Sequence, residues 1–188
     1  MPKIVDHDER RNHASRALWQ VLSRDGVDAV SIRTVAAEAG MKASTLQHYF
    51  TDRAQMLNRS LELVIEQQKA RLDARELPAD PVQLVYELWR QTLPLDDERR
   101  LESEVWLAAT VGLKDPTFRT VLDSADRALH ELCRWTVDVL GGSPDDAEAL
   151  RLFTDGLVLN AVCYPSRFSA ERQTWSLDKF LDQISDGG

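Results

Sequence analysis

Apolar residues recur every three or four positions along most of the chain, which is the spacing of helices with one apolar face. Strand signals are nearly absent, because no alternating apolar run of useful length is flanked by Asn-Gly or Asp-Gly turn chemistry. The pattern therefore predicts an all-α fold. Its expected inward-facing residues in the first, second and fourth helical segments are Ala14, Ala17, Leu18, Val21, Leu22, Ile32, Val35, Ala36, Ala39, Met56, Leu57, Leu61, Val64 and Ile65.

Glycine, proline and capping residues divide the helical pattern into nine segments. Gly26 follows the first apolar face, where a helix end favours a residue that can adopt positive φ. Ser31 is a predicted N-cap, and Asp80, Asp115 and Ser143 each precede a proline at the first position of a predicted helix. The nine predicted helices cover residues 6–25, 32–39, 42–50, 52–75, 81–93, 97–112, 116–140, 144–164 and 170–185.

The third predicted helix combines a narrow apolar side with a wide face of short polar side chains. At about 100° per residue, Ala43, Leu46 and Phe50 fall on one side of it. No Lys or Glu occurs between residues 43 and 50, although solvated helix faces often carry these long side chains. Short polar side chains can approach a hydrogen-bonding surface closely, as a helix in the DNA major groove must. The polar residues of this face and its edges are Ser44, Thr45, Gln47, His48 and Tyr49.

The preceding segment completes the spacing of a helix-turn-helix. A helix from Ser31 to Ala39 is followed by a turn at Gly40 and Met41 and then by the polar helix. A Gln in the groove can pair with adenine, and side chains at the helix edges and flanks can hold phosphates. The candidate DNA contacts are Arg33, Lys42, Ser44, Thr45, Gln47, His48, Tyr49 and Arg53.

The charge distribution separates two parts of the chain. The net charge of -8 argues at first against a polyanionic partner. Residues 1–60, however, hold nine Lys/Arg and seven Asp/Glu, whereas the remaining residues hold fourteen and twenty-four. We therefore expect a DNA-binding head, residues 1–51, and an acidic helical body, residues 52–188.

The stretch SIRTVAAEAGMKASTLQHYFTDRAQML, residues 31–57, resembles the DNA-binding signature of the TetR family of bacterial regulators. The similarity lies in the Val-Ala-x-x-Ala-Gly helix and turn, the Thr-Leu pair and the His-Tyr-Phe ending. In the body, RLESEVWLAATVGLKDPTFR and LFTDGLVLNAVCY are similar to the choline-responsive BetI-type branch. Lys42, Ser44 and Gln47 depart from the residues common in the family, so an operator sequence cannot be transferred from a relative.

This resemblance implies a nine-helix homodimer with a helix-turn-helix head, a ligand pocket among helices four to eight, and a dimer interface formed by the last two helices. It also implies a transcriptional regulator. We expect a repressor that releases its operator when a small-molecule effector of unknown identity binds.

The eighth predicted helix is apolar on two sides, so it must be covered twice. One side can pack on its own body and the other on a second copy, with Gly156 allowing close approach. Twofold symmetry would place two recognition helices ~34 Å apart on a palindromic operator. The alternative is a central helix in a monomer. The candidate interface residues of the last two helices are Leu152, Gly156, Leu159, Cys163, Leu177, Phe180, Leu181 and Ile184.

Aromatic and polar side chains of the body are candidates for the effector pocket. Aromatic faces can hold a cation with about 0.5–2 kcal/mol each, so a quaternary ammonium effector is physically reasonable. Tryptophans at helical spacing are more often core residues, and a buried Asn can instead satisfy a backbone group. The candidate residues are Trp89, Thr92, Trp106, Thr110, Asn160 and Tyr164.

Other classes of function find little support in the sequence. It contains no HExxH, GxSxG, Walker or dinucleotide-binding motif, and no pair of its four histidines has the spacing of metal ligands. We therefore expect no enzyme activity, catalytic residue, metal or cofactor. The remaining alternative to a regulator is a dimeric helical adaptor that does not bind DNA.

Cysteine usage and hydropathy indicate the compartment. Cys133 and Cys163 occur in apolar helical surroundings without a CxxC spacing, which predicts buried, reduced thiols. The charged N-terminus lacks the apolar stretch of a signal peptide, and no window approaches the ~20 apolar residues of a membrane span. We expect a cytoplasmic protein with no membrane partner.

Overall fold

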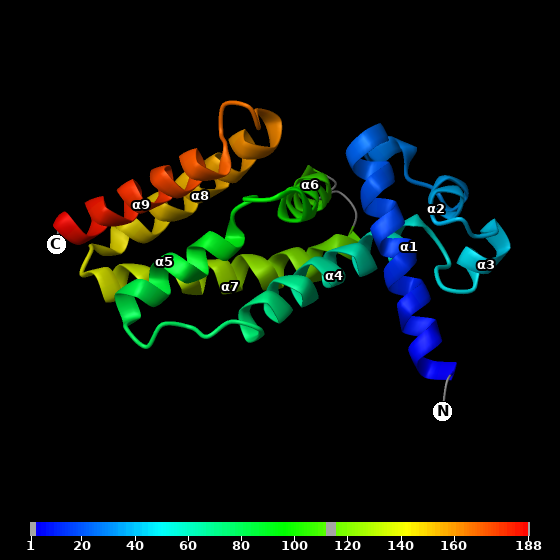
Figure 1. Cartoon of the computed structure of the whole chain (residues 1–188), viewed down its shortest axis with the longest axis horizontal. Coiled ribbons are helices and arrows are strands. Elements are labelled where there is room, and N and C mark those ends of the chain that lie inside the picture. The colour runs from blue at the N-terminus through cyan, green and yellow to red at the C-terminus, as the bar shows by residue number, and fades with distance from the viewer. Residues whose placement is uncertain (1–2, 112–115, 188) are drawn as a thin grey trace. The chain divides into compact units, whose positions relative to one another are not determined.

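The computed structural model describes residues 3–111 and 116–187, and this part of the chain contains nine α-helices, one short 3-10 helix and no strand (Figure 1). The predicted all-α fold is therefore confirmed. The elements in chain order are α1 (Lys3–Asp25), η1 (Val27–Ala29), α2 (Ile32–Glu38), α3 (Ala43–Gln47), α4 (Arg53–Asp73), α5 (Pro81–Thr92), α6 (Asp97–Val111), α7 (Pro116–Leu140), α8 (Pro144–Cys163) and α9 (Ala170–Asp186).

Local capping sets several of these helix limits. The Ser31 hydroxyl accepts from the Thr34 N–H, and the Thr34 hydroxyl oxygen accepts from the Ser31 N–H. Asp80 accepts from the Gln83 N–H at 2.9 Å and so begins α5 as predicted. Gly26 ends α1 with φ 82°. The predicted cap at Asp115 lies outside the described residues.

The third helix is shorter than predicted. A helix of two turns was expected over residues 42–50, whereas α3 ends at Gln47. Beyond it, the Tyr49 N–H donates to the Leu46 carbonyl at 2.9 Å. This bond spans three residues and is typical of a 3-10 turn, which is wound more tightly than an α-helix. Asp52 then accepts from the Gln55 N–H, and the Gln55 side chain accepts from the Thr51 N–H. These two bonds cap the start of α4, which begins at Arg53.

The chain packs into two compact units. The first unit comprises Met1–Gln67 and Glu104–Leu122, and the second comprises Gln68–Ser103 and Asp123–Gly188. The boundaries between them fall inside α4, α6 and α7. The functional division expected at residue 51 stays a prediction.

In the first unit, α1 packs against α2, and α2 packs against α3. Nearly all the inward-facing residues predicted here are buried or half-buried. Ala43 and Ile65 are the exceptions, because Ala43 is exposed and Ile65 is 39% exposed. The apolar side of α3 is therefore narrower than predicted, whereas that of α4 is turned, with Leu63 buried at 4% exposure. The largest side chains with at most 2% exposure are Leu18, Trp19, Leu46, Phe50, Met56 and Leu61.

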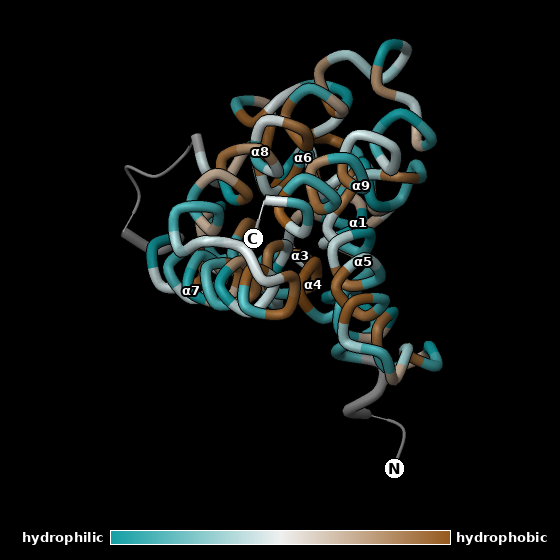
Figure 2. Tube along the Cα trace, turned by 90° about the vertical axis from the view of Figure 1, so that its left-hand side faces the viewer, coloured by the Kyte–Doolittle hydropathy of each residue, from teal (hydrophilic) through white to brown (hydrophobic). Residues whose placement is uncertain are grey.

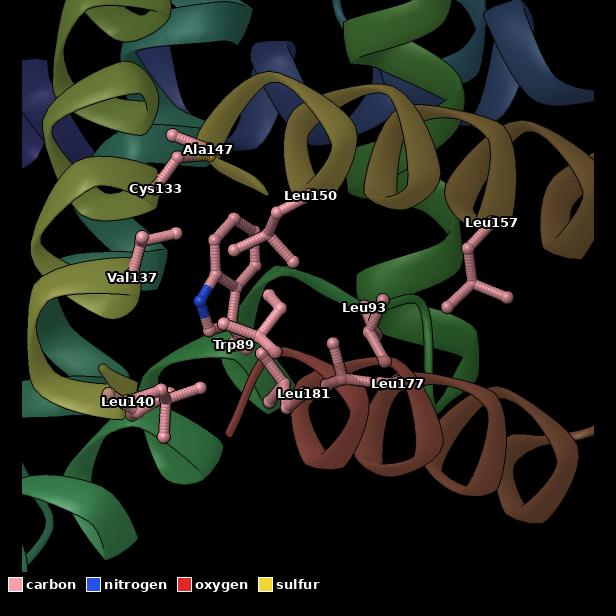
Figure 3. Packing of buried hydrophobic residues seen from close by; sticks show 12 residues of the cluster. Trp89, Leu93, Cys133, Val137, Leu140, Ala147, Leu150, Leu157, Leu177 and Leu181 are labelled. Carbon is pink, nitrogen blue, oxygen red and sulfur yellow. The ribbon is translucent and has the colours of Figure 1, made fainter. Parts of the chain in front are cut away.

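In the second unit, apolar side chains from α5, α7, α8 and α9 converge on Trp89 (Figure 3). The Trp89 indole N–H donates to the Thr136 hydroxyl at 2.8 Å within this core. At the edge of this core, the Tyr86 hydroxyl donates to Asp182 at 2.7 Å. Burial is the larger cause, and this hydrogen bond the next, of a rise in the pKa of Tyr86 to about 12. Figure 2 shows polar and apolar residues alternating along the helices, as amphipathic packing requires.

The two cysteines occupy different environments. Cys133 is buried in the core of the second unit, and burial raises the pKa of its thiol to about 11. Cys163, at the end of α8, is exposed in the single chain, so the prediction that both thiols are buried is wrong for Cys163. Both are free thiols.

Among the described residues, no helix is both long enough and apolar enough to cross a membrane.

Candidate functional site

A tight turn joins α2 to α3 and fixes the angle between them. Gly40 has φ 63°, in the left-handed region that favours glycine. The Met41 N–H donates to the Ala36 carbonyl at 2.8 Å, which closes the turn over the end of α2. Val35 and Ala36 bury the inner face of α2. This is the predicted helix-turn-helix arrangement.

The α3 segment is attached by two apolar side chains and leaves its short polar residues accessible. Leu46 is 0% exposed and Phe50 is 1% exposed. With these anchors inside, the other side of the segment faces outward. Ser44, Gln47 and His48 are exposed, and Thr45 and Tyr49 are half-buried.

The flanking cations of this surface are held differently from one another. Arg53 is exposed, but its guanidinium donates to the Val27 carbonyl of η1 at 2.6 Å, so it is anchored to the first unit. Arg33 and Lys42 are also exposed, and within the described residues neither takes part in an ion pair. Their charges therefore remain available to a polyanion.

Contacts from α1 support the helix-turn-helix, and the sequence pattern gave no sign of them. The His13 ring nitrogen Nε2 bonds with the Ala39 carbonyl at 3.0 Å, at the end of α2. The Arg11 guanidinium lies over the Phe50 ring, 5.7 Å from its centroid. Both partners are distant in sequence, so only the folded arrangement of α1 brings them together.

Other cations of the first unit are neutralised within it. Arg24 donates to Asp25 and Glu38, and the hydrogen bonds from Arg24 hold the pKa of Asp25 below its usual range. Arg59 donates to Glu66 at 2.6 Å. The small excess of positive charge in residues 1–60 is therefore not spread evenly over the surface of this unit.

The candidate effector-pocket residues have mostly internal partners. Trp89 is 0% exposed and packs as a core residue, the alternative considered above for such tryptophans. The Thr92 hydroxyl donates to the Trp89 carbonyl, the Thr110 hydroxyl to the Trp106 carbonyl, and the Asn160 amide to the Gly156 carbonyl.

The pocket candidates also divide between the two units. Trp89, Thr92, Asn160 and Tyr164 belong to the second unit, whereas Trp106 and Thr110 belong to the first. Tyr164 is 59% exposed. The effector pocket stays a prediction.

The candidate dimer residues of α8 form an exposed stripe in the single chain. Leu152 is 66% exposed, Leu159 is 48% exposed, and Cys163 is exposed. Gly156 is half-buried, and a Cβ placed there would meet no atom within 4 Å. Exposed apolar side chains that follow one another along a helix face, unlike single exposed leucines, are typical of an interaction surface.

The candidate dimer residues of α9 are largely covered within their own chain. Leu177, Leu181 and Ile184 are at most 4% exposed, because they pack into the core of their own second unit. Phe180 is half-buried and stacks on Phe153, with ring centroids 4.2 Å apart. The exposed large apolar residue of α9 is Trp175, at 51%. The part that α9 plays in a dimer interface stays a prediction.

Comparison with known proteins agrees with this architecture. The sequence profile of bacterial regulatory proteins of the tetR family matches residues 16–59, and that of the C-terminal region of BetI-type transcriptional repressors matches residues 81–186. The HTH-type transcriptional regulator PksA of Bacillus subtilis (strain 168) is 32% identical over 180 residues, covering 92% of this chain and 88% of PksA.

Solved structures share the whole fold. A transcriptional regulator from Rhodococcus sp. Rha1 has a TM-score of 0.78 at 27% identity, covering 94% of this chain and 96% of that chain. A regulator from Saccharomonospora viridis, solved in complex with choline, has a TM-score of 0.75 at 21% identity, covering 93% and 96%. At that identity the second likeness shows the fold alone. With the matched profiles and the helix-turn-helix, these findings show that the chain belongs to the TetR family, with a BetI-type C-terminal region, and is a DNA-binding transcriptional regulator and not an enzyme.

Proposed function

We propose that two copies of the chain repress transcription by placing α3 of each subunit in the major groove of a palindromic operator. The observation that carries this proposal is the exposed polar surface around α3, anchored from beneath by Leu46 and Phe50. Gln47 is exposed on this surface and can pair with adenine. Thr45 and Tyr49, at its edges, are suited to phosphate contacts that fix the register.

The exposed stripe of α8 supports the dimer. Members of this family bind operator DNA and small molecules, typically as dimers. Leu152 and Leu159 would leave water if a second α8 packed on them, and Gly156 would allow the two backbones to approach closely. Twofold symmetry then presents two α3 helices to half-sites ~34 Å apart. Because the DNA of a bacterial cell is cytoplasmic, the dimer would act in the cytoplasm.

The effector of the proposed repressor is most simply a cation. Residues 61–188 hold twenty-four acidic and fourteen basic residues, so the potential of the body favours positive ligands. The Saccharomonospora viridis regulator was solved in complex with choline, which belongs to this class. The effector must bind better to the arrangement of heads that cannot engage DNA, because equal affinity for both arrangements shifts nothing.

Operator binding tests the proposal. Fluorescence anisotropy with duplexes from the region upstream of the protein's own gene should show specific binding that weakens steeply with salt, because phosphate neutralisation releases counterions. Choline and a panel of amphipathic cations are then titrated into the complex, and one of them should release the DNA. Absence of binding to every duplex at low salt would contradict the proposal and favour the adaptor. Operator binding that none of the cations weakens would contradict the proposal of a cationic effector and would leave the proposal of operator binding intact.

A further inference from the structure

The first turns of α1 reach the proposed DNA-binding surface through one aromatic contact. The rings of His7 and Tyr49 meet edge to face, with centroids 4.6 Å apart and an interplanar angle of 61°. His7 is exposed and Tyr49 is half-buried. Figure 1 shows the segment that follows α3 passing beside the N-terminal half of α1, in agreement with this contact.

Tyr49 carries a large aromatic ring at the edge of this surface. It lies beyond the end of α3, where the Tyr49 N–H donates to the Leu46 carbonyl at 2.9 Å. That bond fixes the backbone of Tyr49, whereas its half-buried ring makes the edge-to-face contact with His7. A ring that must be ordered on binding lowers affinity, whereas one already held in place does not.

We propose that His7 is a positioning residue for DNA binding, which holds the Tyr49 ring so that the phenol hydroxyl meets a backbone phosphate. The edge of one aromatic ring and the face of another attract each other, so the contact restricts the Tyr49 ring before DNA arrives. This inference rests on the proposed DNA-binding function. It extends the interface to a helix outside the helix-turn-helix itself.

The test is a double-mutant cycle read by operator affinity at fixed salt. His7→Ala should weaken binding by about threefold to tenfold, the range expected for ordering one side chain. His7→Phe should restore most of this loss, because the contact needs an aromatic ring and not the imidazole nitrogens. In the Tyr49→Phe background, which lacks the positioned hydroxyl, His7→Ala should have little further effect.

Three results would overturn the inference. Unchanged affinity of His7→Ala would remove any role for His7. Equal losses in His7→Ala and His7→Phe, or additive losses in the double variant, would show that His7 bonds to DNA itself. The third result is a lower Tm of His7→Ala together with a loss of affinity that persists in the Tyr49→Phe background. It would show that His7 contributes to folding and not to DNA binding. A wild-type chain that binds no operator would overturn both proposals, whereas wild-type binding with any of these three results overturns this one alone.

Discussion

Arg71 of α4 and Glu102 of α6 form a bidentate ion pair, in which both N–O distances are 2.6 Å. The Glu102 side chain is 2% exposed and that of Arg71 is 23% exposed. The hydrogen bonds from Arg71 to Glu102 also raise the pKa of Arg71, so the guanidinium keeps its proton. A carboxylate this far from water must have such a partner, because an unpaired buried charge is strongly destabilising. The pair therefore fastens α4 to α6 within the second unit.

Arg71→Ala should lower the free energy of unfolding by about 3 kcal/mol, since it leaves Glu102 buried without a partner. Urea denaturation followed by circular dichroism measures the loss. Arg75→Ala, two residues beyond the end of α4, is the control. Arg75 pairs with Glu87 at 2.6 Å, but its side chain is 48% exposed, so its removal should cost less than about 1 kcal/mol. Equal losses in the two variants would contradict the importance given to burial.

Thr136→Val should lower the free energy of unfolding by about 1–3 kcal/mol, because the buried Trp89 indole N–H would lose its acceptor while the shape of the side chain is kept. Thr92→Val is the control, since the half-buried Thr92 hydroxyl donates to the Trp89 carbonyl, in the backbone of its own helix. Thermal unfolding of both variants provides the comparison. If Thr136→Val were as stable as the wild type, the hydrogen bond would contribute little to the core.

Local signals predicted the ends of several helices because the interactions that set them are local. Ser31 and Thr34 bond to each other's backbone over one turn, and Asp80 caps the helix it precedes. The same kind of signal explains the error in α3. The Asp52 carboxylate caps α4, so residues 48–52 connect the two helices. An apolar pattern contains no information on such capping.

Pairings between helices could not be predicted, since an apolar pattern shows that a face is covered without showing by what. Leu177 and Leu181 have the spacing of an interface, yet α9 packs into its own unit through them. The contact of Arg71 with Glu102 likewise depends on how α4 and α6 pack. The exposure of the polar residues around α3 could be predicted, because most of them follow one another in a single segment. Their contacts with DNA stay a prediction.

Leu152→Glu combined with Leu159→Glu should convert the proposed dimer to a monomer, because two carboxylates would be buried on each side of the twofold axis. Sedimentation velocity at several concentrations measures the change. Leu77→Glu makes the same substitution at a leucine that is 39% exposed but lies outside α8, and it should leave the dimer intact. A dimer that survives the double substitution would exclude the α8 stripe as the interface.

Cys133 should make stability depend on alkaline pH. Burial raises the pKa of its thiol from 9.0 to about 11, so the fold favours the protonated form. The stabilisation is complete below pH 9 and is lost as the pH rises through 11. Between these values, the free energy of unfolding of Cys163→Ser should fall by about 2 kcal/mol more than that of Cys133→Ala combined with Cys163→Ser. Tyr86 is present in both variants, so its own titration cancels. Parallel pH profiles would show that the thiol titrates normally.

Gln47→Ala and Lys42→Ala should separate base reading from phosphate binding. Gln47 is exposed on the polar surface of α3, so its loss should reduce discrimination at one or two operator positions by about 1–3 kcal/mol while leaving non-specific binding nearly unchanged. Lys42 is exposed and lies directly before α3, so its loss should weaken binding to every sequence and reduce the salt slope by about one. A panel of operator variants, titrated at several salt concentrations, measures both quantities. Equal loss for all DNA in both variants would mean that Gln47 contributes charge-independent contacts to the backbone, and base recognition would then have to come from Ser44 or His48.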